Sequence, residues 1–197
     1  MIRFLAAFFF ILSLSLFSPL YCLANSNTYR YQVITVLDGD TLIASDGNVK
    51  FRVRIVAMDA PEKGQPYAEA AKVRLQQLVL GKNIEIQPVG KGYDLYARVL
   101  GHVLVDGINV AGSLVAEGLA HYYRPTCKDY PADRKKYNYD PTLYLKAEEE
   151  AKTQSKGLWS QSKVTLPCRF RHSESGKNKS EEKIWKLWDF VTPEVTF

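Results

Sequence analysis

Apolar and polar residues alternate with a period of two through much of the first half of the chain, between residues 31 and 105. The alternating segments are short, and they are separated by turn dipeptides that include Asp46-Gly47 and Asp106-Gly107. In residues 49–57 the apolar side chains share one face, and the opposite face carries Lys50, Arg52 and Arg54. The pattern predicts that this half is mostly sheet, with Arg54 directed away from the aliphatic row.

Two later segments extend the predicted sheet. Residues 83–89 alternate through Ile84, Ile86 and Pro88. Residues 97–105 are apolar on both faces apart from Arg98 and His102. A segment of this kind is typical of a strand that is buried on both sides.

Helical periodicity appears in three segments. The first covers residues 66–80 and ends at Gly81, and its apolar stripe consists of Ala71, Leu75 and Leu78. The second helix is short: it follows Asn109, a good N-cap residue, and stops near Gly118.

The third helix has the clearest boundaries. Asp140 is its expected N-cap, Pro141 occupies the first position, and Gly157 lies just past the end. Its apolar stripe consists of Leu143, Ala147 and Ala151. The preceding residues, 124–141, are polar and rich in tyrosine, which predicts a surface loop.

Both ends of the chain differ from this central part. Residues 1–24 combine a cationic start, an apolar core and a small residue at Ala24, which is typical of a signal peptide. An uncleaved membrane anchor is the alternative, but the apolar stretch is shorter than the ~20 residues of a spanning helix. Residues 162–197 predict a flexible linker and then a short amphipathic helix, with apolar spacing at Ile184, Leu187 and Trp188. That helix either docks on its own domain or binds a membrane surface or a partner.

Composition places these segments in one globular domain with appendages. The chain has 197 residues, and its 46% hydrophobic content excludes a mainly disordered protein. Lys and Arg number 26 against 21 Asp and Glu, which gives a net charge of +5. This excess favours an anionic partner without identifying it.

Cysteine usage suggests an oxidising compartment. Without Cys22, which lies in the predicted signal peptide, the chain keeps Cys127 and Cys168. A disulfide between them would close a loop of about forty residues, worth ~4 kcal/mol on the chain-entropy model. Two unpaired thiols are the alternative, and no CxxC or Cys/His cluster suggests zinc.

Four acidic residues interrupt the apolar runs at the ends of two predicted strands. Asp38 and Asp40 lie in VLDGDT, and Asp59 and Glu62 end FRVRIVAMDAPE. Each has an ordinary explanation as a turn residue or as an acid in the first turn of a helix. Brought together, however, these carboxylates repel one another and need a counter-charge.

A hard divalent cation supplies such a counter-charge. Ligation by oxygen alone fits Ca²⁺ or Mg²⁺ better than zinc. Arginines beside the same acids, for which Arg54 and Arg98 are the candidates, would add a bidentate grip on phosphate. The combination suits the hydrolysis of phosphodiesters.

These residues together resemble the thermonuclease, or staphylococcal nuclease-like, family. The matching stretches are VLDGDT, RVRIVAMDAPE, YDLYARVLGHV, GLAHYY and KGLWS, and they span residues 30–161. The resemblance implies an α+β, β-rich fold, a five-stranded OB-fold barrel with about three helices. It also implies a secreted, Ca²⁺-dependent nuclease that cleaves DNA and RNA with little sequence specificity and leaves 3′-phosphate ends.

The resemblance further assigns roles residue by residue. It implies calcium ligation by Asp40, Asp59 and the backbone carbonyl of Ala60, with Asp38 as a secondary acid beside the site. It implies a catalytic trio of Arg54, Glu62 and Arg98. Nucleotide contacts are implied for Tyr96 and for one of Tyr122 and Tyr123. Leu95 and Ala97 depart from the family's well-studied member, which has Lys and Gly there.

The expected protein is an exported phosphodiesterase of the micrococcal nuclease type, monomeric, without a membrane span after processing, and periplasmic or extracellular. One rival is an inactive OB-fold module that only binds single strands through basic and aromatic residues. The rival predicts loss of the site acids or arginines. All five of these residues are present: Asp40, Arg54, Asp59, Glu62 and Arg98. A second rival is an envelope interaction module built around the IWKLWDF tail.

Overall fold

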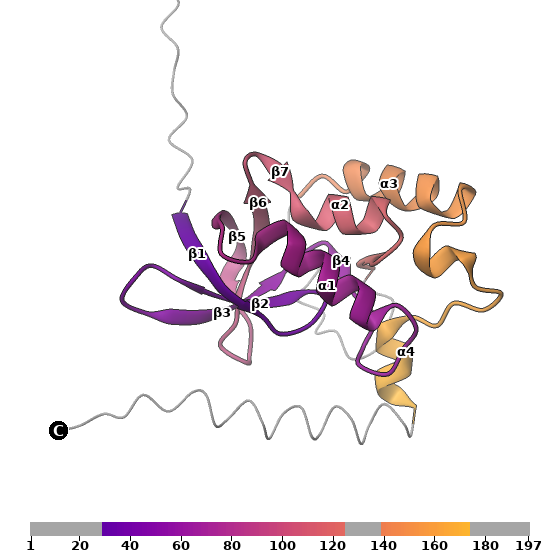
Figure 1. Cartoon of the computed structure of the whole chain (residues 1–197), viewed down its shortest axis with the longest axis horizontal. Coiled ribbons are helices and arrows are strands. Elements are labelled where there is room, and N and C mark those ends of the chain that lie inside the picture. Colours follow the sequence, from indigo (N-terminus) through magenta and orange to yellow (C-terminus); the bar gives the residue numbers. More distant parts are fainter. Residues whose placement is uncertain (1–28, 125–138, 174–197) are drawn as a thin grey trace, which may run out of the picture.

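Five strands close into a barrel in the computed structural model, which describes residues 29–124 and 139–173 (Figure 1). Along the sheet the strands run in the order β3, β2, β1, β5, β6, and a parallel pairing of β6 with β3 closes the barrel. The bounds are β1 Tyr29–Val36, β2 Thr41–Ser45, β3 Lys50–Ile55, β5 Asn83–Tyr93 and β6 Val99–Val105. The predicted five-stranded OB-fold barrel is therefore confirmed.

The predicted alternation along β3 is also confirmed. Val53 and Ile55 are fully buried, whereas the Arg54 side chain leaves the barrel interior and meets acidic residues. The interior is filled by branched aliphatic side chains from every barrel strand, among them Val33, Leu42, Val53, Ile84, Ile86 and Val103. Because β3 pairs with both β2 and β6, Arg54 lies opposite Thr41 on one side and Leu100 on the other.

Two short strand pairs complete the sheet structure. Strand β7, Ile108–Asn109, forms a hairpin with β6 through Asp106 and Gly107, and both turn residues have positive φ, at 51° and 78°. This is the turn that the Asp-Gly dipeptide predicts. Strand β4, Met58–Asp59, pairs with β8, His121–Tyr122, so that Asp59 lies opposite His121.

The three predicted helices are present. They are α1 Ala68–Val79, α2 Val110–Ala116 and α3 Thr142–Thr153. The Asn109 side chain accepts from the Gly112 amide, as expected of the α2 N-cap. The N-cap of α3 is Pro141 rather than the predicted Asp140, whose carboxylate accepts from the Thr142 amide from one position earlier. Helix α2 contacts both α1 and α3, and Figure 1 shows these helices gathered beside the barrel.

The buried face of α3 differs from the prediction. Leu143 is 54% exposed, and the buried positions are Tyr144, Ala147, Glu148 and Ala151. Tyr144 takes the inward position because its ring stacks on Tyr122 and its hydroxyl accepts from the Asn109 side chain. Tyr144, an aromatic residue with a polar hydroxyl group, therefore occupies the buried position that the predicted stripe gave to Leu143.

After α3 the chain continues through a 3₁₀ helix, η2 Gly157–Ser160, to a helix that the sequence pattern did not predict, α4 Pro167–His172. Helix α4 lies inside residues 162–197, so the first part of the segment predicted to be a flexible linker is partly helical. Within the described ranges no helix is both long and apolar enough to span a membrane. The predicted signal peptide, most of the 124–141 loop and the IWKLWDF tail lie outside the described residues.

Candidate active site

VLDGDT forms the tight connection between β1 and β2. The Leu37 amide donates to the Thr41 carbonyl at 2.9 Å. A Cβ atom on Gly39 would lie 2.6 Å from the Cβ of Ala60 and 2.9 Å from that of Ala71, so a side chain at this position would displace the turn. Glycine therefore lets the turn pack directly against the segment that follows β4. The acids of this motif belong to a turn and to the acidic cluster at the same time.

Asp40 lies at the centre of the cluster. Its Oδ1 accepts from the Thr41 hydroxyl at 3.0 Å, and its Oδ2 accepts from the Ala60 amide at 3.1 Å. The Asp40 amide donates in turn to Asp38 Oδ1 at 3.2 Å, so Asp38 shapes the turn that presents Asp40. The structure thus brings Asp38, Asp40 and Ala60 together, as the sequence analysis expects.

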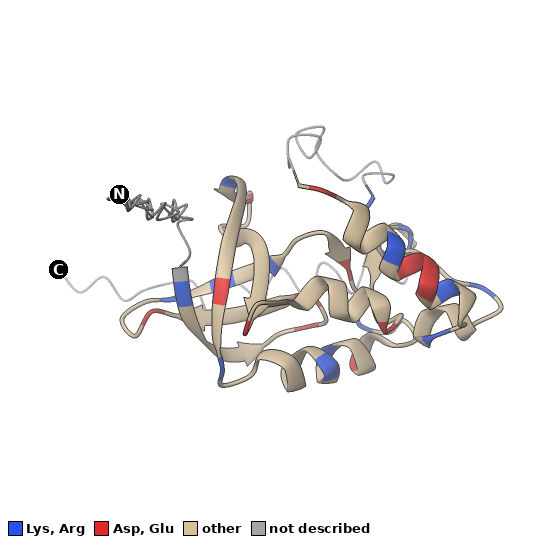
Figure 2. Ribbon diagram, turned by 90° about the horizontal axis from the view of Figure 1, so that it is seen from above, with Lys and Arg blue, Asp and Glu red and all other residues tan. Residues whose placement is uncertain are grey.

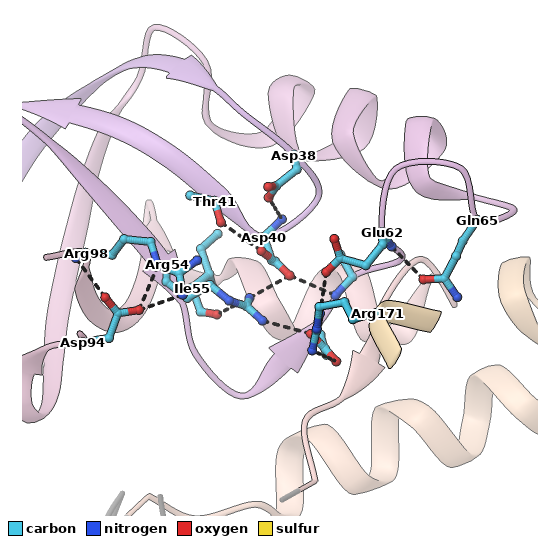
Figure 3. Close-up of polar contacts among 12 residues, drawn as sticks. Asp38, Asp40, Thr41, Arg54, Ile55, Glu62, Gln65, Asp94, Arg98 and Arg171 are labelled. Carbon is cyan, nitrogen blue, oxygen red and sulfur yellow. Dashed lines mark hydrogen bonds and ion pairs between the residues drawn. The ribbon is translucent and has the colours of Figure 1, made fainter. Parts of the chain in front are cut away.

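Arg54 joins the two halves of the cluster. Its Nη1 lies 2.8 Å from Asp40 Oδ2, and its Nη2 lies 3.0 Å from Asp59 Oδ1 (Figure 3). Nη1 also donates to the Ile55 carbonyl at 3.0 Å. One guanidinium therefore bridges carboxylates from the β1–β2 turn and from β4, which are separated by nineteen positions. Its planar fork suits such a bridge better than a lysine would.

Glu62 lies on the loop between β4 and α1. Its amide donates to the Gln65 side chain at 2.8 Å, and its carboxylate accepts from Arg171 Nη1. Nη2 of Arg171 lies 3.8 Å from Asp59 Oδ2. Figure 3 shows Arg171 reaching Glu62 from the ribbon of α4. The role of Arg171 was not predicted, because a contact across 109 positions leaves no local pattern in the sequence. Pro167, a residue favoured at helix starts, is the available sequence signal for α4.

Arg98 lies just before β6, on the far side of Arg54 from Glu62 in Figure 3. Its Nε and Nη2 donate to Asp94 Oδ2 at 2.8 and 2.7 Å. Asp94 Oδ1 also accepts from the backbone amides of Tyr96 and Arg98. Asp94 therefore holds both the turn and the arginine side chain. The role of Asp94 in holding Arg98 was not predicted, although the spacing of four between Asp and Arg in YDLYAR was a usable signal.

The three candidate tyrosines have different surroundings. Tyr96 is 60% exposed, and the Arg98 guanidinium carbon lies 5.5 Å from its ring centroid. Tyr122 is partly buried between the Arg124 guanidinium and the Tyr144 ring. Tyr123 is only 8% exposed. The Tyr96 ring is thus the most accessible to a base, and the Tyr123 ring is the least.

The donor atoms of the cluster fit a hard divalent cation. Asp40 and Asp59 supply carboxylate oxygens, and a hard cation completes such a pair with carbonyls, waters and substrate phosphate. Among the described residues, no group of three or more Asp, Glu, His or Cys side chains is close enough to enclose an ion. The protein therefore provides two carboxylates already aligned by Arg54, and further ligands would come from backbone or solvent oxygens.

Cys168 is buried on α4, three residues before Arg171. Its expected partner, Cys127, lies outside the described residues. The disulfide between them stays a prediction.

Comparison with known sequences agrees with this arrangement. The family model described as "Staphylococcal nuclease homologue" matches residues 52–161, more than half of the chain. The chain belongs to the staphylococcal nuclease family. The match contains Arg54, Asp59, Glu62 and Arg98, and it ends before α4.

The alignments with curated relatives cover most of the length of each relative. An "uncharacterized endonuclease" of Haemophilus influenzae is 34% identical over 87% of this chain and 83% of the relative. An "uncharacterized endonuclease" of Escherichia coli is 36% identical over 72% of this chain and 84% of the relative. A "micrococcal nuclease" of Shigella flexneri is 33% identical over 74% and 82%, respectively.

Proposed function

We propose that this chain is a nuclease that hydrolyses phosphodiester bonds of DNA and RNA with the help of Ca²⁺. Its family, and the names of its endonuclease and micrococcal nuclease relatives, support cleavage of nucleic acid. The observation that carries the proposal is the bridge by which Arg54 contacts Asp40 at 2.8 Å and Asp59 at 3.0 Å, so that residues from three separate segments converge. Such a group offers oxygens to a cation and a guanidinium to a phosphate.

The residues divide into complementary roles. Glu62 orients the attacking water and accepts its proton, because its partly exposed carboxylate can reach solvent. Arg54 and Arg98 stabilise the additional negative charge that forms on the phosphate oxygens in the transition state. Asp94 holds Arg98 in place. Both arginines act through their fixed positive charge.

Asp40, Asp59 and the Ala60 carbonyl are the proposed Ca²⁺ ligands. When bound, Ca²⁺ would offset the charge of the scissile phosphate as a Lewis acid. Arg54 holds the two carboxylates at a fixed separation, which reduces the entropy lost when they take up a cation. Tyr96 is proposed to stack on a base next to the cleaved bond.

Further parts of the proposal concern products and location. The products carry 3′-phosphate ends, and the protein acts as a monomer after export to the periplasm or the medium. A disulfide between Cys127 and Cys168 accompanies that location.

Digestion of plasmid DNA, single-stranded DNA and RNA by the mature protein tests the proposal. We expect cleavage with Ca²⁺ and none with EGTA. Glu62→Gln should lower kcat by about 10²–10⁴-fold, and Arg98→Ala by about 10²–10³-fold. Glu69→Gln is the matched control, because Glu69 is an exposed acid in the first turn of α1.

Each negative outcome of the digestion assays would contradict a different part of the proposal. Full activity in EGTA would remove calcium from the proposal and leave the nuclease. Activity unchanged by both substitutions would remove the assigned roles. Binding of single strands without cleavage in any metal would favour the inactive OB-fold module.

A further inference from the structure

The C-terminal segment after the family match returns to the candidate active site. The Gln65 side chain donates to the Thr165 carbonyl at 2.9 Å, and the same side chain accepts from the Glu62 amide. The Tyr67 hydroxyl lies 2.9 Å from the Ser160 hydroxyl. The loop that carries Glu62 and the segment that leads to α4 are therefore hydrogen-bonded to each other at Gln65 and at Tyr67.

Helix α4 is itself anchored. Pro167 and Cys168 on its first turn are buried. Arg171, one turn later, extends from this anchored end to Glu62 and Asp59. The position of Arg171 is thus set by packing and by backbone hydrogen bonds, which is how a functional side chain is held at a defined place.

The Glu62–Arg171 pair lies at the rim of the site. The two side chains are 20% and 25% exposed. Water can solvate a carboxylate at this level of exposure, so burial does not require an arginine partner there. Ion pairs that keep contact with solvent contribute little to stability, so stability alone is a weak reason for the contact.

The charges of the site indicate what Arg171 adds. Asp40, Asp59 and Glu62 carry three negative charges, and Arg54 and Arg171 carry two positive charges. A guanidinium at this rim would attract the phosphodiester backbone of a strand that approaches Glu62. It also occupies one lone pair of Glu62 Oε1, so fewer positions on this carboxylate can accept a hydrogen bond from water while the contact lasts.

We propose that Arg171 is a substrate-binding residue that exchanges Glu62 for a phosphate oxygen when a nucleic acid strand binds. The exchange frees the Glu62 carboxylate at the moment when a water beside it has a phosphorus atom to attack. This inference rests on the proposed nuclease function, and it extends the site beyond the family match to residue 171.

The experiment compares Arg171→Gln and Arg171→Lys with Arg169→Gln, which alters an exposed arginine two residues earlier on the same helix. KM and kcat are measured on a single-stranded oligonucleotide with saturating Ca²⁺ at 50–200 mM salt. Equilibrium binding of the same oligonucleotide is measured in EGTA by fluorescence anisotropy. Thermal unfolding of each variant checks that the fold is intact.

We expect Arg171→Gln to raise KM by about ten- to hundredfold, the loss of one charge-assisted hydrogen bond. The slope of log affinity against log salt should become shallower by about 0.7, the value for one phosphate contact on a single strand. Arg171→Lys should keep the wild-type slope, because it keeps the charge, and should recover only part of KM. Arg169→Gln should leave KM within twofold.

Other results overturn the inference. Equal KM and equal salt slopes for Arg171→Gln and Arg169→Gln would show that Arg171 does not touch the strand. A higher kcat/KM for Arg171→Gln, with a lower Ca²⁺ concentration for half-maximal rate, would show that Arg171 blocks the site. If the wild type binds DNA but does not cleave it, the nuclease proposal fails, and the anisotropy slopes still decide the role of Arg171.

Discussion

Two clusters of carboxylate and cationic side chains in this protein differ in the sign of their net charge. The first surrounds Glu148 on α3, whose side chain is 1% exposed and bonds to Arg124 at 2.6 Å and to Lys152 at 2.8 Å. The Tyr122 amide also donates to it, at 3.0 Å. The second cluster is the candidate active site, in which Asp40, Asp59 and Glu62 meet two arginines. Glu148 and Lys152 lie on α3, the helix on which acidic and basic segments alternate in Figure 2.

The excess charge distinguishes the two clusters. One acid meets two cations at Glu148, whereas three acids meet two cations at the candidate site. Burial on its own raises the pKa of Glu148, but hydrogen bonds from Arg124 and Lys152 outweigh it and hold this pKa below its ordinary value. Glu148 is therefore satisfied inside the protein. The candidate site retains an excess of negative charge on Asp40 and Asp59, which are only 8% and 5% exposed, and such an excess favours the uptake of a cation.

The largest expected effect separates the clusters by activity. Arg54→Ala should lower kcat/KM by about 10³-fold, because it removes a preorganised charge and releases Asp40 and Asp59 from each other. Glu148→Gln should leave kcat/KM within twofold. Initial rates on single-stranded DNA at saturating Ca²⁺ provide the measurement. Equal losses in the two variants would contradict the division into functional and structural clusters.

The second effect separates them by stability. Glu148→Gln should lower the free energy of unfolding by about 2 kcal/mol, the usual value of hydrogen bonds to a charged group. The full charge-pair energy does not apply, because the side chains of Arg124 and Lys152 are more than a third exposed and water screens them. Urea denaturation measures the change. Glu150→Gln, at a 56% exposed position on the same helix, is the control and should change stability by less than 0.5 kcal/mol.

The barrel and the first half of the candidate site were predictable from sequence because their signals are local. Period-two alternation gave the orientation of Arg54, and the Asp-Gly dipeptides marked the hairpin turns. The acids of VLDGDT and MDAPE each end a strand, so the alternation that defines the strands also places them at one end of the barrel. The geometry then adds the bridge from Arg54, which joins Asp40 and Asp59.

The remaining features depend on contacts between distant residues. Arg171 meets Glu62 across 109 positions, and Glu148 meets Tyr122 across 26. Leu143 was wrong for the same reason, although Ala147 and Ala151 of its predicted stripe are buried: Tyr144 turns inward to meet Tyr122 and Asn109. Packing and charge determine which side chains on separate elements meet. The periodicity along one helix does not identify these partners.

A third effect concerns a histidine that lies between the two clusters. His121 is opposite Asp59 on the neighbouring strand and packs edge-on against Trp159. Burial lowers its pKa from the ordinary value of 6.5. Asp59 and Glu148 act to raise this pKa, and Arg124 and Lys152 act to lower it. Burial therefore outweighs the attraction of both sets of acids.

The sign of the pH dependence follows from that shift. Below pH 6.5 His121 takes up a proton in the unfolded chain but not in the folded chain, because its folded pKa is lowered. The free energy of unfolding is therefore fully present above pH 6.5. It falls on acidification until the pH passes below the lowered folded pKa. His121→Leu should reduce the loss of unfolding free energy between pH 7 and pH 5, by at most about 1.4 kcal/mol for each pH unit of the shift. His102, whose pKa burial also lowers, keeps part of the dependence in that variant. An unchanged pH profile would show that the two clusters together hold His121 at its ordinary pKa.

The smallest effect concerns a third carboxylate–guanidinium pair, Asp94 with Arg98, which a turn holds rather than burial. Ala97 in this turn has φ of 54°, a left-handed conformation that costs a residue with a Cβ about 1 kcal/mol. Ala97→Gly should raise the free energy of unfolding by about 0.5 kcal/mol, because the relief of strain exceeds the extra entropy of glycine in the unfolded chain. Ala70→Gly, at an exposed position in α1, is the control and should lower it by about 1 kcal/mol. Loss of stability in both variants would mean that the Asp94 hydrogen bonds, and not the backbone conformation at position 97, determine how firmly Arg98 is held.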